Sequence, residues 1–403
     1  MTIPREKTYA SILVALDGSD DSLAGGRLAL AIAGSTGAPL RAVHVYDTKI
    51  HNTRFREMEP GLPQRYREQA ALGKLRHEHD LLMADGFRSL SLGYMEDFLA
   101  EADRMGVRAT GEAVEGRNYI GLLSLLERHP VDLVVLGAAG LGKQGDGMLG
   151  STALRVLRRA SCDVLIARAG TGGIGGRTLL ACTDGSAAAT AALRRAAALA
   201  ESLAAELRLF AAYDVEFHKT IFRTMARSLS MDRQRQIGLD RQEAVHEELI
   251  DKSLEALYSA FLQAGARELA VANGEVRTCL RPGKAYRAIV DYAGEAGAAL
   301  VVLARFGHNL ETASDIGSHA EAVTRLAPCH VLVCNGGETP AGTSRQGEMF
   351  WEEEALRRLE RIPAPVRAMA RKAIEEQAVA GGASAVTLEV MQAVAGRFGM
   401  GEN

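Results

Sequence analysis

Glycine and hydroxyl residues follow one strongly apolar run of this sequence at a spacing that suits the binding of a phosphate chain. The run Asp132–Leu136 is followed by Gly137-Ala-Ala-Gly140, here called the glycine turn, and, after nine intervening residues, by Gly150-Ser151-Thr152. Glycine lets the backbone approach an anion closely, and a helix start offers free N–H groups and the positive end of the helix dipole. The sequence therefore predicts an anion seat, formed by the glycine turn and a helix that begins near Gly150.

Length and composition limit what kind of protein can carry this seat. The 403 residues are too many for one ordinary α/β core, and 47% hydrophobic with 24% charged residues is typical of a globular chain. A net charge of −3 without a long basic run argues against nucleic acid as a partner. The sequence shows no apolar run of membrane-spanning length and no signal-peptide pattern, so no membrane association is expected. The five cysteines lack a CxxC pair, which favours reduced thiols and a cytoplasmic location.

An internal repeat with a constant offset of 167 residues indicates the domain organisation. Asp17-Gly-Ser19 recurs as Asp184-Gly-Ser186, since 184 − 17 = 167, and Gly150-Ser151 recurs as Gly317-Ser318. The sequence therefore predicts two copies of one α/β unit, here called repeat one and repeat two. The expected boundaries are 1–170 for repeat one, 171–335 for repeat two, 336–348 for a linker and 349–403 for a helical C-terminal domain.

Apolar strands and helical segments alternate within each repeat. In repeat one, strands are expected over 11–16, 40–46, 108–114, 132–136 and 162–167, and a long helical segment over 62–105, with Gly73, Gly86 and Gly93 as points where it could break. This alternation predicts parallel strands with right-handed crossovers, which is a Rossmann-like, doubly wound sheet. Ligands of such sheets bind at the carboxyl ends of the strands.

Three motifs together resemble the universal stress protein family, and the resemblance covers both repeats. They are Leu13-Val-Ala-Leu-Asp-Gly-Ser19, the pair His44-Val45, and the glycine spacing that ends at Gly150-Ser151. The resemblance implies an adenine nucleotide (ATP, AMP or ADP), with Mg as an accompanying ion. Asp17 and Val45 would hold adenine and ribose, and the glycine turn and Ser151 the phosphates. The residues expected at the nucleotide in repeat one are Ala15, Asp17, Val45, Leu136, Gly137, Gly140, Gly150, Ser151 and Thr152.

Asp17 also has a purely structural interpretation. An aspartate or serine just before an alanine-rich helix is an ordinary N-cap, and only the neighbouring phosphate motif favours a role in binding.

Repeat two departs from the motif of repeat one. Ala304 replaces the first glycine, with Arg305 beside it, and Ala212 stands where repeat one has Val45. The methyl group of Ala304 is tolerable only if the backbone there stays at negative φ. The residues expected at a second nucleotide are Asp184, Ala304, Gly307, Gly317 and Ser318.

Each repeat carries an insertion after its second strand, with histidines and apolar residues that recur at the same offset. Two histidines per repeat could form a metal site or a pH-sensitive contact, but a structural role within a helical cap is the more frequent outcome. The apolar residues predict a face that packs on the same domain or on the other repeat. The residues are His51, Phe55, Met58 and His79, with the counterparts His218, Phe222, Met225 and His246. His308 and His319 lie in the second phosphate-loop region.

The C-terminal segment predicts three helices, beginning near Trp351, Val366 and Thr387. It resembles the small helical domain at the C-terminus of the light-independent protochlorophyllide reductase B subunit, through Trp351-Glu, Arg361-Ile-Pro and Val386-Thr387. No reductase catalytic portion accompanies it. Because so short a segment is marginal as an independent fold, Trp351 is expected to dock on a repeat or to pair with the tail of a second chain.

No nucleophile–base pair or paired carboxylates can be placed at the phosphate seat, so a binding protein is expected rather than an enzyme. The expected function is that of an ATP- or AMP-binding stress or signalling regulator. Its repeats would form an intramolecular pseudo-dimer, its chains a possible homodimer, and its tail would bind a protein partner. One alternative is a nucleotide-independent scaffold whose tail recruits a redox or pigment-biosynthesis enzyme. Another is a slow ATPase.

Overall fold

The computed structural model describes two units of the chain. The described residues are 8–142, 149–216, 220, 224, 227–236, 238, 251–273, 276–307, 316–336, 350, 351, 355, 358, 359, 374 and 385–387. Contacts divide the chain into a first unit, Met1–Phe306 with Asp315–Gly337, and a second, Gly307–Ser314 with Glu338–Asn403. The strands of both repeats therefore belong to the first unit. Of the helices in the described ranges, none is long and apolar enough to span a membrane.

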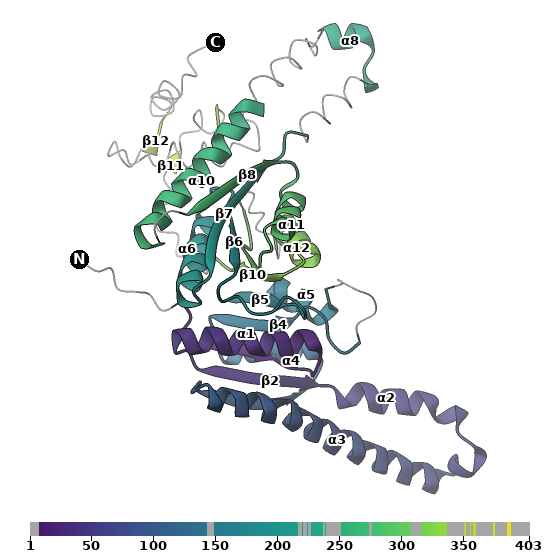
Figure 1. The fold of residues 1–403 in the computed structure, drawn as a ribbon. Helices are drawn as coiled ribbons and strands as arrows, with labels where there is room; N and C mark the ends of the chain where they lie inside the picture. Colours follow the sequence, from purple (N-terminus) through teal and green to yellow (C-terminus); the bar gives the residue numbers. More distant parts are fainter. Residues whose placement is uncertain are drawn as a thin grey trace. The chain divides into compact units, whose positions relative to one another are not determined.

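One ten-stranded sheet runs through the first unit in the order β3-β2-β1-β4-β5-β10-β9-β6-β7-β8 (Figure 1). Strands within a repeat pair in parallel, as the alternation of strands and helices predicts. The strands of repeat one are β1 (Ile12–Ala15), β2 (Leu40–Tyr46), β3 (Ala109–Glu115), β4 (Leu133–Gly137) and β5 (Asp163–Ala167). Those of repeat two are β6 (Thr178–Cys182), β7 (Glu206–Tyr213), β8 (Arg277–Pro282), β9 (Leu300–Ala304) and β10 (His330–Cys334).

The two repeats are joined through β5 and β10, which pair antiparallel. Leu165 lies opposite Leu332, which is its own counterpart because 332 − 165 = 167. A residue that faces its own equivalent marks the position of a twofold axis. The repeats are therefore related by a pseudo-twofold axis at this pair, and they form the intramolecular pseudo-dimer that the repeated sequence predicts.

Helices cover both faces of the sheet, and a separate hydrophobic core lies under each layer. One layer contains α1 (Asp20–Thr36), α3 (Gln69–Arg104), α6 (Ala187–Ser202) and α10 (Asp251–Asn273). The other contains α4 (Asn118–Arg128), α5 (Ser151–Arg159), α11 (Ala285–Glu295) and α12 (Ser318–Leu326). Because both faces are covered, the central strands are buried throughout, which explains their continuous apolar runs.

The insertion of repeat one forms a two-helix arm. It consists of α2 (Thr48–Met58), two short 3-10 turns (Glu59–Gly61 and Gln64–Tyr66) and the first half of α3, and it extends beyond the sheet (Figure 1). The expectation that glycines could break this segment was wrong, because α3 is continuous over 36 residues. Its glycines face open space, so they cost helix propensity without interrupting the hydrogen bonds. The described helices of the second insertion are α8 (Met231–Gln236) and α10.

The second unit contains a short parallel ladder between β11 (Phe350–Trp351) and β12 (Ala385–Val386). The predicted helix start at Trp351 was therefore wrong, and the segment is not purely helical. Aromatic residues favour strands, and the first helical position among the residues described after Trp351 is Ala355. Ala355 and Val386 are fully buried. The docking of Trp351 on a repeat stays a prediction.

Candidate functional site

A cavity of about 710 Å³ lies at the carboxyl ends of β1, β2 and β4 in repeat one. Its volume is within the range of about 300–1,000 Å³ that is usual for small-molecule sites. The structure brings all nine residues predicted for repeat one to its walls. They are Ala15, Asp17, Val45, Leu136, Gly137, Gly140, Gly150, Ser151 and Thr152.

The start of α5 forms one end of this cavity. Gly150 is the N-cap of α5, and its N–H donates to the Ala138 carbonyl at 2.7 Å, which holds the helix start against the glycine turn. A Cβ atom at Gly150 would lie 3.3 Å from that oxygen, so glycine permits the close approach. Among the described residues no side chain caps α5. The N–H groups of its first turn are therefore available to an anion in the cavity.

The glycine turn is held in place by a residue that the sequence interpretation missed. The buried Asp21 carboxylate accepts the Ala139 N–H at 3.0 Å through Oδ2 and the Ala169 N–H at 2.6 Å through Oδ1. A Cβ atom at Gly137 would lie 2.7 Å from the Ser22 nitrogen, so the first motif glycine lets α1 pack against the end of β4. In the sequence, the role of Asp21 is indicated only by its being the second of two acids in the first turn of α1.

Asp17 lies beside the glycine turn. Its Oδ1 accepts the Ser19 N–H at 3.0 Å, and a Cβ atom added at Gly140 would lie 2.5 Å from its Oδ2. The cap interpretation of Asp17 was wrong, since Ser19 is the N-cap of α1 and accepts the Ser22 N–H at 3.2 Å. Asp17 instead stabilises the turn before the helix and presents its second carboxylate oxygen to the cavity.

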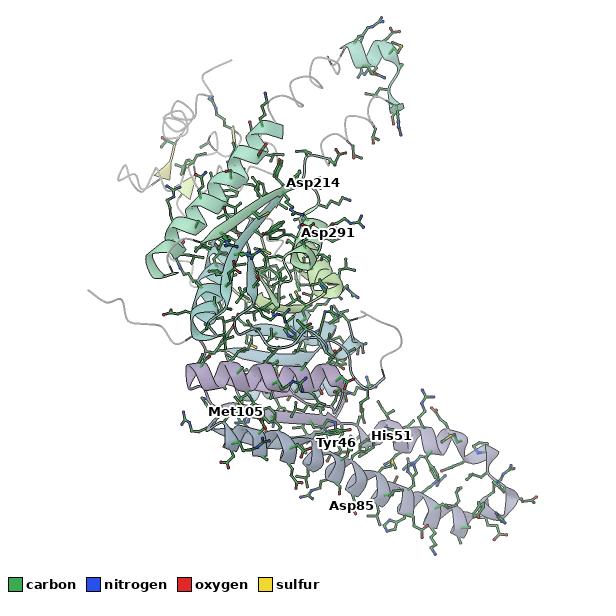
Figure 2. The ribbon with its side chains drawn as sticks, in the orientation of Figure 1. Tyr46, His51, Asp85, Met105, Asp214 and Asp291 are labelled. Atoms are coloured by element: carbon green, nitrogen blue, oxygen red, sulfur yellow. The ribbon has the colours of Figure 1, made fainter. Side chains whose placement is uncertain are left out.

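The base of the arm forms the opposite wall, which the motifs did not indicate. The residues there are His44, Tyr46, Asp47, Ile50, His51, Phe87, Leu90 and Tyr94. Tyr46 and His51 lie where the arm leaves the sheet (Figure 2). Asn118, at the start of α4, also lines the cavity. Period-2 alternation along β2 was the available signal, because it places His44 and Tyr46 on the face opposite Val45.

We assign the proton of the neutral His44 ring to Nδ1 from its hydrogen-bond partner. The Ser91 hydroxyl donates to the Phe87 carbonyl at 2.7 Å, so its oxygen accepts from Nδ1–H of His44, also at 2.7 Å. Burial lowers the pKa of His44, and the nearby Asp17 opposes this effect. The neutral ring therefore keeps its Nε2 lone pair as a hydrogen-bond acceptor.

The other histidines of the arm pack against rings. The His51 ring lies 4.9 Å from that of Phe87, and His79 stacks on Phe55 at 4.2 Å. In the part of the chain that the structure describes, no group of three metal-ligating side chains is found. The predicted apolar face holds for Phe55, but not for Met58, which is 62% exposed. The counterparts His218, Phe222, Met225 and His246, and also His308, lie outside the described residues.

The site residues of repeat two are described only in part. Gly317 is the N-cap of α12, next to Ser318, and its N–H donates to the Arg305 carbonyl at 2.9 Å, as at Gly150. Ala304 ends β9 and is not at positive φ, which meets the condition stated for its methyl group. Asp184 stabilises its turn through the Ser186 N–H at 3.0 Å, and Gly307 lies in the second unit. A second nucleotide site stays a prediction.

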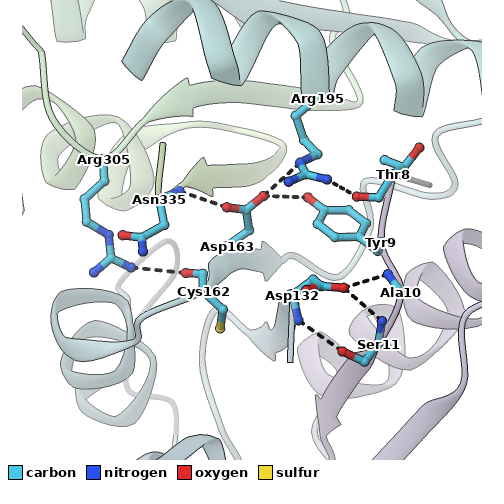
Figure 3. A network of polar contacts seen from close by, with 10 residues as sticks. All are labelled: Thr8, Tyr9, Ala10, Ser11, Asp132, Cys162, Asp163, Arg195, Arg305 and Asn335. Carbon is cyan, nitrogen blue, oxygen red and sulfur yellow. Dashed lines mark hydrogen bonds and ion pairs between the residues drawn. The ribbon is translucent and has the colours of Figure 1, made fainter. Parts of the chain in front are cut away.

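Arg305 does not extend its charge towards an open phosphate seat. Its side chain is only 4% exposed and donates to the Cys162 carbonyl of repeat one at 3.4 Å (Figure 3). Asp163 beside it accepts from Tyr9 at 2.9 Å and from the Asn335 N–H at 2.8 Å, and pairs with Arg195 at 3.3 Å. Through Arg305, Asn335 and Arg195 of α6, these contacts tie repeat two to the start of β5.

Comparison with known proteins defines the class of this fold and site. A model of the universal stress protein family matches residues 8–168 and 176–335, which is most of the chain. The chain therefore belongs to the universal stress protein family. A second model, described as the proto-chlorophyllide reductase 57 kD subunit, matches residues 351–394.

Individual relatives resemble one repeat at a time. A universal stress protein of Methanocaldococcus jannaschii is 29% identical over 163 residues, which cover 40% of this chain and 84% of that protein. One from Thermus aquaticus is 29% identical over 162 residues, which cover 40% of this chain and 99% of that protein.

A solved structure supports the same fold, and a second is similar in sequence to one repeat. A universal stress protein from Pseudomonas aeruginosa has a TM-score of 0.50 at 15% identity, with 81% of this chain and 94% of that chain covered. A universal stress protein solved in complex with cAMP is 25% identical over 40% of this chain and 99% of that chain, with a TM-score of 0.27.

Proposed function

We propose that repeat one binds an adenine nucleotide and that the protein acts as a nucleotide-responsive regulator. The cavity at the carboxyl ends of β1, β2 and β4 carries this proposal, because it joins the uncapped start of α5 to the walls at Asp17 and Val45. Phosphates would accept N–H groups from the first turn of α5, which the helix dipole favours. The base and ribose would lie towards Val45.

Titration of the full-length chain with ATP, ADP and AMP, with and without Mg²⁺, tests the proposal. We expect one nucleotide per chain in repeat one. Ser151→Glu would place a carboxylate among the amides that receive the phosphates, so affinity should fall by at least about tenfold, or about 1.4 kcal/mol. An acid in the first turn of a helix is otherwise favourable, so α5 should still form.

The matched control is Ser318→Glu, at the counterpart position in repeat two. It should leave the nucleotide affinity of repeat one unchanged, and loss of a second binding event would assign a site to repeat two. Absence of any nucleotide binding to the wild-type chain would contradict the proposal. So would equal affinities of the wild type and Ser151→Glu.

We also propose that binding, and not turnover, is the activity of this site. Measured phosphate release from ATP should stay far below the rates of about 1–10³ s⁻¹ that are typical of enzymes. Release at such rates, lost in Asp17→Ala, would instead support the alternative of an ATPase.

A cytoplasmic location, homodimer formation and a protein partner for the C-terminal segment belong to the same proposal, and pull-downs with and without ATP would test the partner.

A further inference from the structure

The cavity of repeat one extends to a face of the sheet that a mononucleotide in the proposed seat does not use. Val45 faces α4, since a Cβ atom at Gly121 would lie 2.6 Å from its Cγ1. His44 and Tyr46 face the opposite way and contact α3. Both sets of side chains nevertheless line the same cavity, which passes over the strand ends at Asp17.

The part of the cavity beside α3 is lined by rings, and it is called here the ring compartment. Its residues are His44, Tyr46, His51, Phe87 and Tyr94. Tyr46 is stacked on Phe87 with centroids 5.9 Å apart and an interplanar angle of 9°. His51 lies 4.9 Å from Phe87, and His44 meets Tyr94 edge-on at 5.2 Å. Rings held by one another form a preorganised surface for another planar ring.

Hydrogen-bond acceptors border the ring compartment. Nε2 of His44 has no partner among the described residues, and Asp17 presents a carboxylate oxygen to the cavity. Asp47 is already engaged, because it caps α2 by accepting the Ile50 N–H at 3.2 Å. The polar edge of the compartment is therefore complementary to a ring that carries N–H donors, such as the amino group of a purine.

We propose that repeat one binds a dinucleotide, with the phosphate chain at α5 and the second base in the ring compartment. The inference rests on the proposed nucleotide site. A mononucleotide whose base lies at Val45 occupies the face that carries α4 and α5, so it leaves the rings beside α3 uncovered. A second base linked through phosphates would reach over Asp17 and bury its faces against these rings.

Repeat two offers an internal comparison. The counterparts of His44, Ser91 and Tyr94 are Ala211, Tyr258 and Phe261, and Leu254 stands at the position of Phe87. Repeat two therefore lacks the histidine acceptor and its serine partner. Repeat two keeps rings at this place, since Tyr258 lies 6.5 Å from Tyr213 and 5.5 Å from Phe261, so the histidine acceptor and the Phe87 ring are what distinguish the ring compartment of repeat one.

Calorimetric titration of the full-length chain with AMP, ATP and diadenosine tetraphosphate tests the inference. We expect the dinucleotide to bind at least about tenfold more tightly than ATP, which corresponds to about 1.4 kcal/mol. Phe87→Ala should reduce this ratio towards one, because it removes the ring that supports both Tyr46 and His51. Tyr46→Leu, which keeps an apolar side chain but loses the ring, should reduce it in the same direction if Phe87→Ala fails to fold.

The matched control is Leu82→Ala, on α3 but 64% exposed and outside the cavity walls. It should leave the ratio at its wild-type value. Equal affinities for ATP and the dinucleotide in the wild-type chain would overturn the inference while leaving the proposed nucleotide site intact. Failure of all three ligands to bind would overturn both.

Discussion

The two repeats share a helix–helix contact, α1 with α3 in repeat one and α6 with α10 in repeat two. The large side chain of this contact comes from α3 in repeat one and from α6 in repeat two. In repeat one, Gly26 of α1 faces Phe98 of α3, and a Cβ atom at Gly26 would lie 3.3 Å from the ring. In repeat two, the counterparts are Leu193 of α6 and Gly265 of α10, and a Cβ atom at Gly265 would lie 2.8 Å from Leu193 Cδ1. The pair keeps its total size while its members exchange roles, as close packing requires.

The same comparison clarifies the first motif glycine. Gly137 has the Ser22 backbone 2.7 Å from the position of a Cβ atom, whereas its counterpart in repeat two is Ala304. Gly25 and Gly26 of α1 correspond to Ala192 and Leu193 of α6. Gly137 is therefore required by the packing of α1 against the end of β4.

Exchanging the sizes of Gly26 and Phe98 in repeat one tests whether the two repeats pack this helix contact in equivalent ways. Gly26→Leu should destabilise the protein by about 1–3 kcal/mol through overpacking, and Phe98→Gly by about 3–5 kcal/mol through a cavity. The double variant copies repeat two, so its cost should be below the sum of the single costs by about 0.5–3 kcal/mol. Urea unfolding followed by circular dichroism measures all three, and strict additivity would refute the exchange.

A smaller effect is expected at the motif glycine. Gly137→Ala should destabilise repeat one by about 1–3 kcal/mol, because the added methyl meets backbone atoms that cannot rotate away. The reverse change, Ala304→Gly, should cost about 0.5–1 kcal/mol, mainly through chain entropy. Thermal unfolding of the two variants compares them, and equal losses would show that α1 and α6 pack alike.

His330, the counterpart of Asp163, lies in β10 where the two repeats pair, and we expect it to make the stability of the protein depend on pH. His330 is fully buried, accepts the Arg168 N–H at 3.1 Å through Nδ1 and contacts the Gly172 carbonyl at 2.8 Å through Nε2. Burial lowers its pKa below 6.5. The unfolded chain therefore binds a proton at this histidine more readily than the folded chain does. The stability that neutral His330 contributes is complete above pH 6.5 and is lost as the pH falls. Burial raises the pKa of Asp163, which acts in the opposite sense, with stability lost as the pH rises.

His330→Gln should therefore weaken the dependence of the unfolding temperature on pH between about pH 7.5 and pH 5.5. The wild-type protein should lose more stability over this interval than the variant. The exposed His129→Gln serves as the control and should retain the wild-type slope. An unchanged slope in His330→Gln would rule out this histidine as the source of the acid sensitivity.

The smallest effect is expected at an exposed ion pair of repeat two. Arg194 contacts Glu268 at 2.5 Å, with side chains 68% and 36% exposed. Arg194→Ala should change the free energy of unfolding by less than about 1 kcal/mol, because solvent screens such pairs. Arg27→Ala, at the counterpart position, should behave alike. A clear difference between the two would mean that surface charge also distinguishes the repeats.

Much of the fold could be predicted because its signals are local or periodic. The strands of repeat one match their expected ranges to within one or two residues, and the nine residues predicted for its site line one cavity. The misses depend on longer-range contacts. Asp21 reaches Ala169 across 148 positions of sequence, and the arm brings Phe87 next to Tyr46. The strand at Trp351 requires its partner at Val386 to form.

The sequence by itself determined the duplication, the parallel strand–helix alternation and the phosphate-type spacing after β4. These features follow from residue periodicity and backbone freedom, which act over a few neighbouring positions. Only the tertiary structure decided that Ser19 and not Asp17 caps α1, that Arg305 faces the interface, and that the arm adds rings to the cavity of repeat one. Each of these depends on which side chains meet across the sheet, and close packing between distant segments decides that.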